Sequence, residues 1–389
     1  MKRFLLVSVL LIGCSAGSGG NSDPTPTPDP TPTPIVIGDA WRVTAVPDLT
    51  GDGIGDLLAA VVDVAEPGVI VYAGPIGATL PAPFATFVAP DGARIGSAFL
   101  GAMDVVGDGS PDLVAGALFD GRLFAIEGPL APGPQALLDG VVLQGDGSAF
   151  FGSSLATGNL APVSARALAI ASPGEPEEAC FSGSGARIVA LPLVAGTASL
   201  AATTGFDPFT CPGSWLAARD FTGDGIDDLL MSSTDGGAFV FDGPLSGDLT
   251  AGGAQFLDVT SNVYGYWIAA AGAMVDADAD GDDELALIDR NAGELVVHTL
   301  PLGAAAPTRI AVPGIPLDRQ GDLNGDGFGD LVLVDDEFTA HQVWVMLAPL
   351  GSAQTFTGSF GWVSVGDVND DGHADLLTLG TAGLQVRSY

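Results

Sequence analysis

Short acidic loops are the part of this sequence whose residue types and spacing could do chemistry. The first loop, "DLTGDGIGD", has Asp at positions one, five and nine, Thr at position three and Gly at positions four and six. Oxygen donors at alternating positions around a sharp glycine turn can wrap a hard divalent cation such as Ca²⁺. Because carboxylates held a few ångströms apart repel one another, a divalent ion would stabilise the loop.

The loop is not of the EF-hand type. An EF-hand needs an entering helix and a bidentate Glu at position twelve, but position twelve is Ala59, within the apolar run "DLLAAVV". A short apolar run bounded by turn residues is typical of a buried strand. Asp56, at position nine, would therefore complete a cation site just where the strand begins.

The acidic loop recurs along the chain. Further copies begin at Asp104, Asp220, Asp276, Asp322 and Asp367, and a copy without carboxylates begins at Asn159. A second landmark, a strand ending in Pro, keeps the same phase in segments such as "VYAGPIG", "FAIEGPL" and "FVFDGPL". Seven units of about fifty residues are typical of four-stranded propeller blades.

We therefore predict an all-β, seven-bladed β-propeller over residues 35–389, with no helical domain. The last unit, residues 358–389, is too short for four strands. We expect residues 35–38, "IVIG", to supply the missing strand, close the ring and remove its exposed edges.

The repeats resemble the FG-GAP, or integrin alpha-type, β-propeller family. "FGSSLATGN" carries a Phe-Gly start at Phe151 and Gly152, and "AIASPGE" matches a later motif element at Ala171 to Pro173. The resemblance implies one calcium ion per loop, between the first two strands of a blade. It also implies ligands at positions one, three, five and nine, with the carbonyl of position seven.

Carried onto this sequence, the resemblance implies up to six calcium ions. The implied ligands are Asp48, Thr50, Asp52 and Asp56 in loop one; Asp104, Asp108 and Asp112 in loop two; Asp220, Thr222, Asp224 and Asp228 in loop four; Asp276, Asp278, Asp280 and Glu284 in loop five; Asp322, Asn324, Asp326 and Asp330 in loop six; and Asp367, Asn369, Asp371 and Asp375 in loop seven.

The loops match the calcium pattern unequally. Loop five has the most carboxylates, whereas loop two has Val106 at position three and the third copy has no carboxylate. The alternative is that these Asp-Gly segments are only turns, since turns favour Asp and Gly. We prefer the calcium interpretation, because a turn by itself does not need an acid at position nine.

The amino terminus predicts export and lipidation. Residues 1–13 combine Lys2 and Arg3 with an apolar stretch too short to span a bilayer, as in a signal peptide. "LIGC" resembles the bacterial lipobox, which implies acyl chains on Cys14. Residues 14–34 form a Gly/Ser- and then Pro-rich tether that we expect to be disordered. These features indicate a bacterial outer-membrane lipoprotein, for which surface exposure is one option.

Two further cysteines remain, Cys180 and Cys211. In an oxidising envelope compartment such a pair often forms a disulfide, which would join the loops around units three and four. The alternative is two unpaired buried thiols.

Composition and motifs favour binding over catalysis. A net charge of −35, from 12 basic and 47 acidic residues, argues against nucleic acid. The three histidines lie outside any recognisable nucleophile motif, so we predict a non-enzymatic, monomeric adhesion module for a protein or glycan ligand. Recognition would use the face opposite the ions, where Tyr264, Tyr266 and Trp267 are candidates. The alternatives are a polysaccharide lyase or hydrolase acting in the channel, and a scaffold without external ligand.

Overall fold

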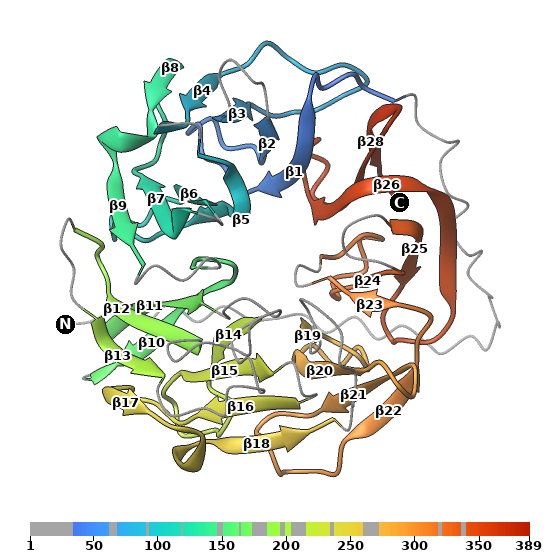
Figure 1. The fold of residues 1–389 in the computed structure, drawn as a ribbon. Coiled ribbons are helices and arrows are strands. Elements are labelled where there is room, and N and C mark those ends of the chain that lie inside the picture. Colours follow the sequence, from blue (N-terminus) through green and yellow to red (C-terminus); the bar gives the residue numbers. More distant parts are fainter. Residues whose placement is uncertain are drawn as a thin grey trace, which may run out of the picture.

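The computed structural model arranges the chain as a ring of β-sheets (Figure 1). It describes residues 34–61, 68–90, 93–117, 120–145, 151–162, 165–172, 185–194, 199–203, 215–233, 237–259, 272–317, 321–335 and 340–389. These include two short 3-10 turns, η3 (Leu137–Asp139) and η5 (Ala251–Gly253). The fold class is all-β, as the sequence predicts.

Consecutive antiparallel strands build each sheet. The first sheet holds β1 (Ala40–Val46), β2 (Asp56–Val61), β3 (Gly68–Tyr72), β4 (Ala85–Val88) and β8 (Gly133–Ala136). The second holds β5 (Ile95–Met103), β6 (Asp112–Ala117), β7 (Arg122–Ile126) and β9 (Val141–Gln144). The third holds β10 (Leu155–Ala161), β11 (Ala165–Ser172), β12 (Gly185–Ala190), β13 (Ser199–Thr203) and β17 (Gly247–Leu249). β8 and β17 come from the following repeat and pair in parallel.

The remaining three sheets continue the ring. The fourth holds β14 (Leu216–Arg219), β15 (Asp228–Ser233), β16 (Gly237–Phe241) and β18 (Gln255–Asp258). The fifth holds β19 (Gly272–Val275), β20 (Glu284–Asp289), β21 (Glu294–His298) and β22 (Thr308–Ala311). The sixth holds β23 (Ile315–Pro316), β24 (Leu331–Val334), β25 (Ala340–Met346), β26 (Ala353–Gly366), β27 (Asp375–Gly380) and β28 (Gly383–Arg387).

The described strands form six sheets, whereas the sequence predicts seven blades. The difference arises at β26, a continuous strand of 14 residues. Its first part pairs with β25 and its last part pairs with β27. Because β26 does not break between repeats six and seven, hydrogen bonds join both repeats in one six-stranded sheet. The prediction of seven separate blades is wrong for this reason.

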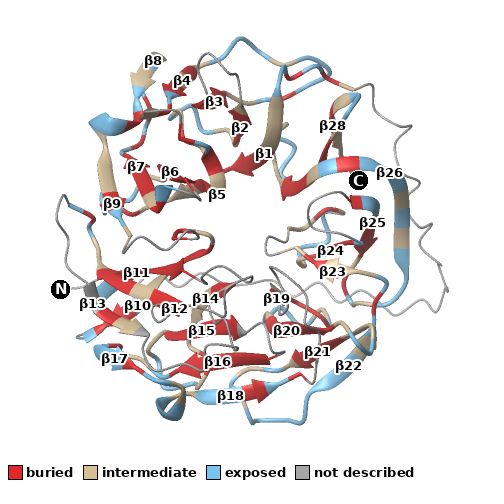
Figure 2. Ribbon diagram, viewed as in Figure 1, coloured by how far each residue is buried: buried red, intermediate tan, exposed pale blue. Residues whose placement is uncertain are grey.

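Hydrophobic packing between consecutive repeats forms the core. On β2, Leu57 and Ala59 face the last repeat while Leu58 and Ala60 face the second, because successive side chains point to opposite faces of a strand. The described residues form seven such clusters, each between two consecutive repeats. Figure 2 shows buried residues along the inner strands and exposed residues on β22 and the first part of β26.

The two ends of the ring meet at β1. Ala45 packs in one cluster with Leu377, and its N–H donates to the Ser364 hydroxyl at 3.3 Å. Ile35 forms a single antiparallel bridge with Leu384, at N···O distances of 2.7 and 2.9 Å. The predicted fourth strand over residues 35–38 is not formed beyond this bridge, because the chain turns at Gly38, whose φ is 61°.

A recurring backbone hydrogen bond, which we call the clip, connects neighbouring repeats. The residue after the proline landmark donates its N–H to the carbonyl oxygen at position two of the preceding loop. The clips join Leu130 to Leu49, Leu193 to Val105, Leu245 to Leu160, Leu302 to Phe221, Leu350 to Ala277 and Ile76 to Val368, at 2.5–2.9 Å. Between repeats six and seven, where the proline is missing, Ala374 N–H instead donates to the Asp322 carbonyl at 2.8 Å.

Candidate metal centres on one rim

The six acidic loops lie on one rim, because each joins the first two strands of its repeat, and they share one backbone turn. In loop one the Asp48 carboxylate accepts the N–H of Gly51 at 2.6 Å and of Gly53 at 2.7 Å. Positions four and six have φ between 62° and 99° in every acidic loop. Glycine adopts this left-handed conformation freely, whereas Ala279 and Asp370 adopt it at position four of loops five and seven. The glycine spacing therefore sets the direction of the loop backbone.

The acid at position nine is buried and bound by backbone amides. Asp56 Oδ2 accepts N–H groups from Leu49 at 2.7 Å and Thr50 at 2.9 Å, while Oδ1 accepts the N–H of Gly74 at 3.1 Å. Equivalent bonds occur at Asp112, Asp228 and Asp330. The argument that the turn needs no acid here is therefore wrong, since this carboxylate connects the loop to the end of the third strand.

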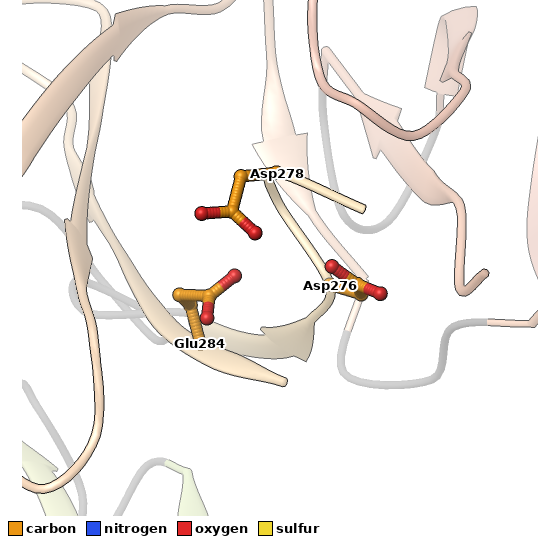
Figure 3. Close-up of side chains that lie close together, drawn as sticks. All are labelled: Asp276, Asp278 and Glu284. Atoms are coloured by element: carbon orange, nitrogen blue, oxygen red, sulfur yellow. The ribbon is translucent and has the colours of Figure 1, made fainter. Parts of the chain in front are cut away.

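Loop five brings three carboxylates together (Figure 3). Asp276, Asp278 and Glu284 each present an oxygen, and these oxygens lie within 4.8 Å of one another. Asp276 and Glu284 are 3% exposed, whereas Asp278 is exposed. Among the described residues no cationic side chain forms an ion pair with any of the three. Carboxylate oxygens are the ligands that Ca²⁺ prefers, so the donor set fits that ion.

Glu284 explains why loop five differs from the others. The backbone N–H of Ala277 donates to its Oε2 at 2.9 Å. Its side chain is one methylene longer than that of Asp, and its carboxylate faces that of Asp278 in the close-up (Figure 3). The departure from Asp at position nine therefore accompanies the tightest group of carboxylates among the described loops.

Position three supplies neutral groups in four other loops. The Thr50 hydroxyl lies 3.5 Å from Asp48 and 3.4 Å from Asp56 in loop one. In loop six the Asn324 amide donates to the Asp326 carboxylate at 2.9 Å. Asn369 does the same for Asp371 and Asp375 in loop seven. These neutral groups reduce the repulsion between the carboxylates without adding a charge.

In loop two, an arginine neutralises the first acid. Arg166 Nη1 lies 2.6 Å from Asp104 Oδ2, and its Nη2 donates to the Asp104 carbonyl at 3.1 Å. Arg166 belongs to the third copy, at its position eight. Loop two therefore has a fixed positive charge, while its position three is the apolar Val106.

Position eight is a site that the sequence reasoning missed. In loop four it is Asp227, whose carboxylate accepts the N–H of Asn159 in the preceding copy at 2.7 Å. In loop five it is Asp283, which pairs with Arg219 at 2.8 Å. In the sequence, the signal for these contacts is a charged residue just before position nine. In the structure, that residue contacts the neighbouring repeat.

The position-nine carboxyls of loops six and seven have raised pKa values. Burial raises the pKa of Asp330 to about 6, and the charges of Asp326 and Asp322 act in the same direction. Burial likewise raises the pKa of Asp375 to about 6. At Asp48 burial also acts upward, but hydrogen bonds from Gly53, Gly51 and neighbouring amides outweigh it and lower the pKa. A cation beside these groups would favour their ionised forms.

The histidines are spread over three repeats. His298 lies on β21, His341 on β25 and His373 in loop seven. The His373 ring lies against Gly325, where an added Cβ would come within 2.3 Å of it. In loops one, two and four a proline occupies the equivalent place, as Pro129 does beside Gly51. His373 thus packs between loops six and seven.

Several predicted features lie outside the described residues. These are the signal peptide and tether up to residue 33, Cys14, Cys180, Cys211, Tyr264, Tyr266, Trp267 and Pro173. Within the described part of the chain, no helix has the length and apolar character needed to cross a bilayer.

Solved structures with this arrangement of sheets identify the fold. The crystal structure of BBS1N in complex with ARL6DN, soaked with lead, matches with a TM-score of 0.55 and 14% identity, over 93% of this chain and 95% of that chain. A streptogramin B lyase structure matches with a TM-score of 0.52 and 9% identity, over 92% and 96%. The chain is a β-propeller. Chaetomium thermophilum Raptor gives a TM-score of 0.52 at 12% identity, over 90% of this propeller and 28% of that chain.

These similarities concern the fold alone, because the identities are low. No protein-family model matches the propeller, and no curated protein matches it either. The resemblance to FG-GAP repeats therefore rests on the motifs quoted above.

Proposed function

We propose that this propeller is a calcium-stabilised binding module whose acidic rim holds cations and whose opposite face recognises a protein or glycan. The convergence of Asp276, Asp278 and Glu284 carries the proposal, since their oxygens lie within 4.8 Å of one another. Asp280 and the carbonyl of Asp282 would complete the ligand set, and the FG-GAP-like motifs extend it to loops one, four, six and seven. The proposed module consists of seven FG-GAP-like repeats, and Ile35 pairs with the last repeat where the ring closes.

Binding fits the chemistry of the described residues better than catalysis. The described histidines lie in three separate repeats, and the ordering of the position-nine acids by backbone amides accounts for their spacing. A similar fold occurs in a complex of BBS1N with ARL6DN, which supports a protein partner. A similar fold also occurs in a streptogramin B lyase, so an enzyme acting on a polysaccharide is the second candidate.

The calcium proposal is tested by titrating calcium into the full protein in a calorimeter. We expect several sites with dissociation constants of roughly 0.1 to 1 mM, as in extracellular modules. Asp278→Asn should remove one site, because this exposed side chain completes the group in loop five. Asp282→Asn, which changes an exposed side chain in the same loop, is the matched control. Absence of binding heat and of a thermal shift in the wild type would refute the proposal.

We also propose that acyl chains on Cys14 anchor the protein in a bacterial outer membrane. The lipobox-like "LIGC" and the Pro-rich tether support this location. Cys14→Ser should move the protein from the membrane fraction to the soluble fraction of the envelope. Unchanged fractionation would count against lipidation.

A further inference from the structure

A cavity of about 440 Å³ lies between β26, β27 and β28. The loop at residues 367–375 joins β26 to β27, whereas the turn at residues 380–383 joins β27 to β28. These connections lie at opposite ends of the strands. The cavity includes the second and extends along β28 to Arg387, which pairs in register with Leu376, the residue after Asp375. A volume of this size lies in the range of ligand pockets, about 300–1,000 Å³.

The lining of the cavity combines polar and apolar residues and contains no acid. Its lining residues include Thr355, Thr357, Ser359, Gln385 and Arg387, and none of the lining residues is Asp, Glu, His or Cys. The chain contains 47 acidic residues, and none of them lines this cavity. The lining also lacks a pair of groups for acid–base catalysis, which favours binding without turnover.

Arg387 is a cation without an acidic partner among the described residues. Its Nη2 donates to Gln385 Oε1 at 3.0 Å, and its guanidinium carbon lies 4.9 Å from the centre of the Phe356 ring. Its Nε is buried without a hydrogen-bond partner. Burial lowers the pKa of Arg387, since its charge has lost water without gaining a carboxylate.

A second unpaired group lies on the neighbouring strand. Thr378 is 1% exposed, and its Oγ1 has no hydrogen-bond partner. Thr378 lies opposite Gln385 in the register of β27 and β28, and both residues line the cavity. A buried hydroxyl without a partner is unfavourable, and a ligand that supplies the missing hydrogen bond recovers this loss.

We propose that this cavity binds a small polyhydroxylated carboxylate, the chemistry of a uronic acid residue. Arg387 pairs with the carboxylate, Thr378 and Gln385 contact hydroxyl groups, and the ring of Phe356 or Phe360 packs against the apolar face of the sugar. The site rests on the proposed role as a binding module and specifies one class of ligand. It does not depend on calcium at the rim.

The test is titration of the full protein with glucuronate, in calcium and in chelator, with glucose as the uncharged comparison. We expect glucuronate to bind about tenfold more tightly than glucose, because a charge-assisted bidentate contact is lost with glucose. Arg387→Met should weaken glucuronate binding by about tenfold or more. Arg94→Met, which removes an exposed arginine outside the cavity, should leave binding unchanged.

Thr378→Val separates a binding role from a structural one. It keeps the shape of the side chain and removes the unpaired hydroxyl, so glucuronate affinity should fall severalfold while the melting temperature stays equal or rises. Wild-type protein that does not bind glucuronate, or Arg387→Met protein that binds it normally, would overturn the proposal. If calcium still binds in those experiments, the rim proposal stands and this cavity alone is refuted.

Discussion

The negative charge of the acidic loops is compensated differently in repeats two and three than in repeats five to seven. In loop two the guanidinium of Arg166 lies 2.6 Å from Asp104, and position three is apolar. In loop five three carboxylates converge with no cationic side chain of the described residues paired to them. The same backbone turn thus accommodates either a built-in positive charge or a surplus of negative charge. The sequence of a loop, and not the shape of its backbone, therefore decides where a cation would stabilise this propeller.

The largest effect should come from removing the acid at position nine. Asp112→Ala and Asp228→Ala each leave three backbone N–H groups without their acceptor. At about 1–3 kcal/mol for each buried group, we expect a loss of at least about 3 kcal/mol in chelator. Urea unfolding measures it, with the corresponding Asn variants as milder controls. If Asp112→Ala lowers the free energy of unfolding only slightly, the acid at position nine has no major structural role.

The next effect should distinguish the two regions by calcium dependence. Asp326→Ala and Asp108→Ala change position five of loops six and two. Asp326→Ala should lower the melting temperature more in calcium than in chelator, because a lost site forfeits about 1–3 kcal/mol of ligand stabilisation. Asp108→Ala should give equal shifts in both buffers. Equal shifts for Asp326→Ala would contradict its role as a ligand.

A third effect concerns pH in the absence of calcium. The pKa of Asp330 and of Asp375 is about 6 in the folded protein, above the ordinary value of 3.8. The folded state therefore binds protons more tightly, so this stabilisation is complete below about pH 4 and is lost as pH rises through 6. In chelator we expect stability to fall by about 1–2 kcal/mol between pH 5 and pH 7. Asp330→Asn should reduce this dependence, and an unchanged pH profile would contradict it.

The smallest effect should come from Arg166→Gln. Its ion pair with Asp104 is partly exposed, so we expect a loss of about 0.5–1 kcal/mol that shrinks at high salt and does not depend on calcium. Arg122→Gln, which breaks the 3.5 Å pair with Asp120 away from the acidic loops, is the matched control. If Arg166→Gln gives a calcium-dependent gain in stability, loop two can bind a cation once the arginine is removed. The contrast between loop two and loop five would then be wrong.

The sequence predicted features that depend on local pattern. Glycine at positions four and six of loop one predicts the turn, and the apolar run after Asp56 predicts β2. The proline landmark keeps its phase because the residue after it makes the clip. Features that depend on neighbours in space were not predictable. No local pattern shows that β26 continues from repeat six into repeat seven, or that Arg166 reaches Asp104 in another loop.

Position nine shows why a correct pattern can support an incomplete argument. The repeat period correctly indicates that Asp56 has a role. However, an acid that accepts backbone N–H groups and an acid that binds a cation both appear in the sequence as Asp at position nine. The backbone partner Gly74 lies 18 residues further along the chain, so the loop sequence gives no sign of it. Only the folded arrangement separates the two roles.

The clip between repeats has a consequence for how such a chain can grow. Each repeat from the first to the sixth presents the same donor to one neighbour, and the acceptor at position two recurs in the loop that it meets. If a whole repeat among the first six were duplicated or deleted, every clip donor would still meet an acceptor. Gene rearrangements by complete repeats would therefore conserve the clips. The junction of repeats six and seven lacks this bond and shares β26, which makes it the place where unit exchange would be disruptive.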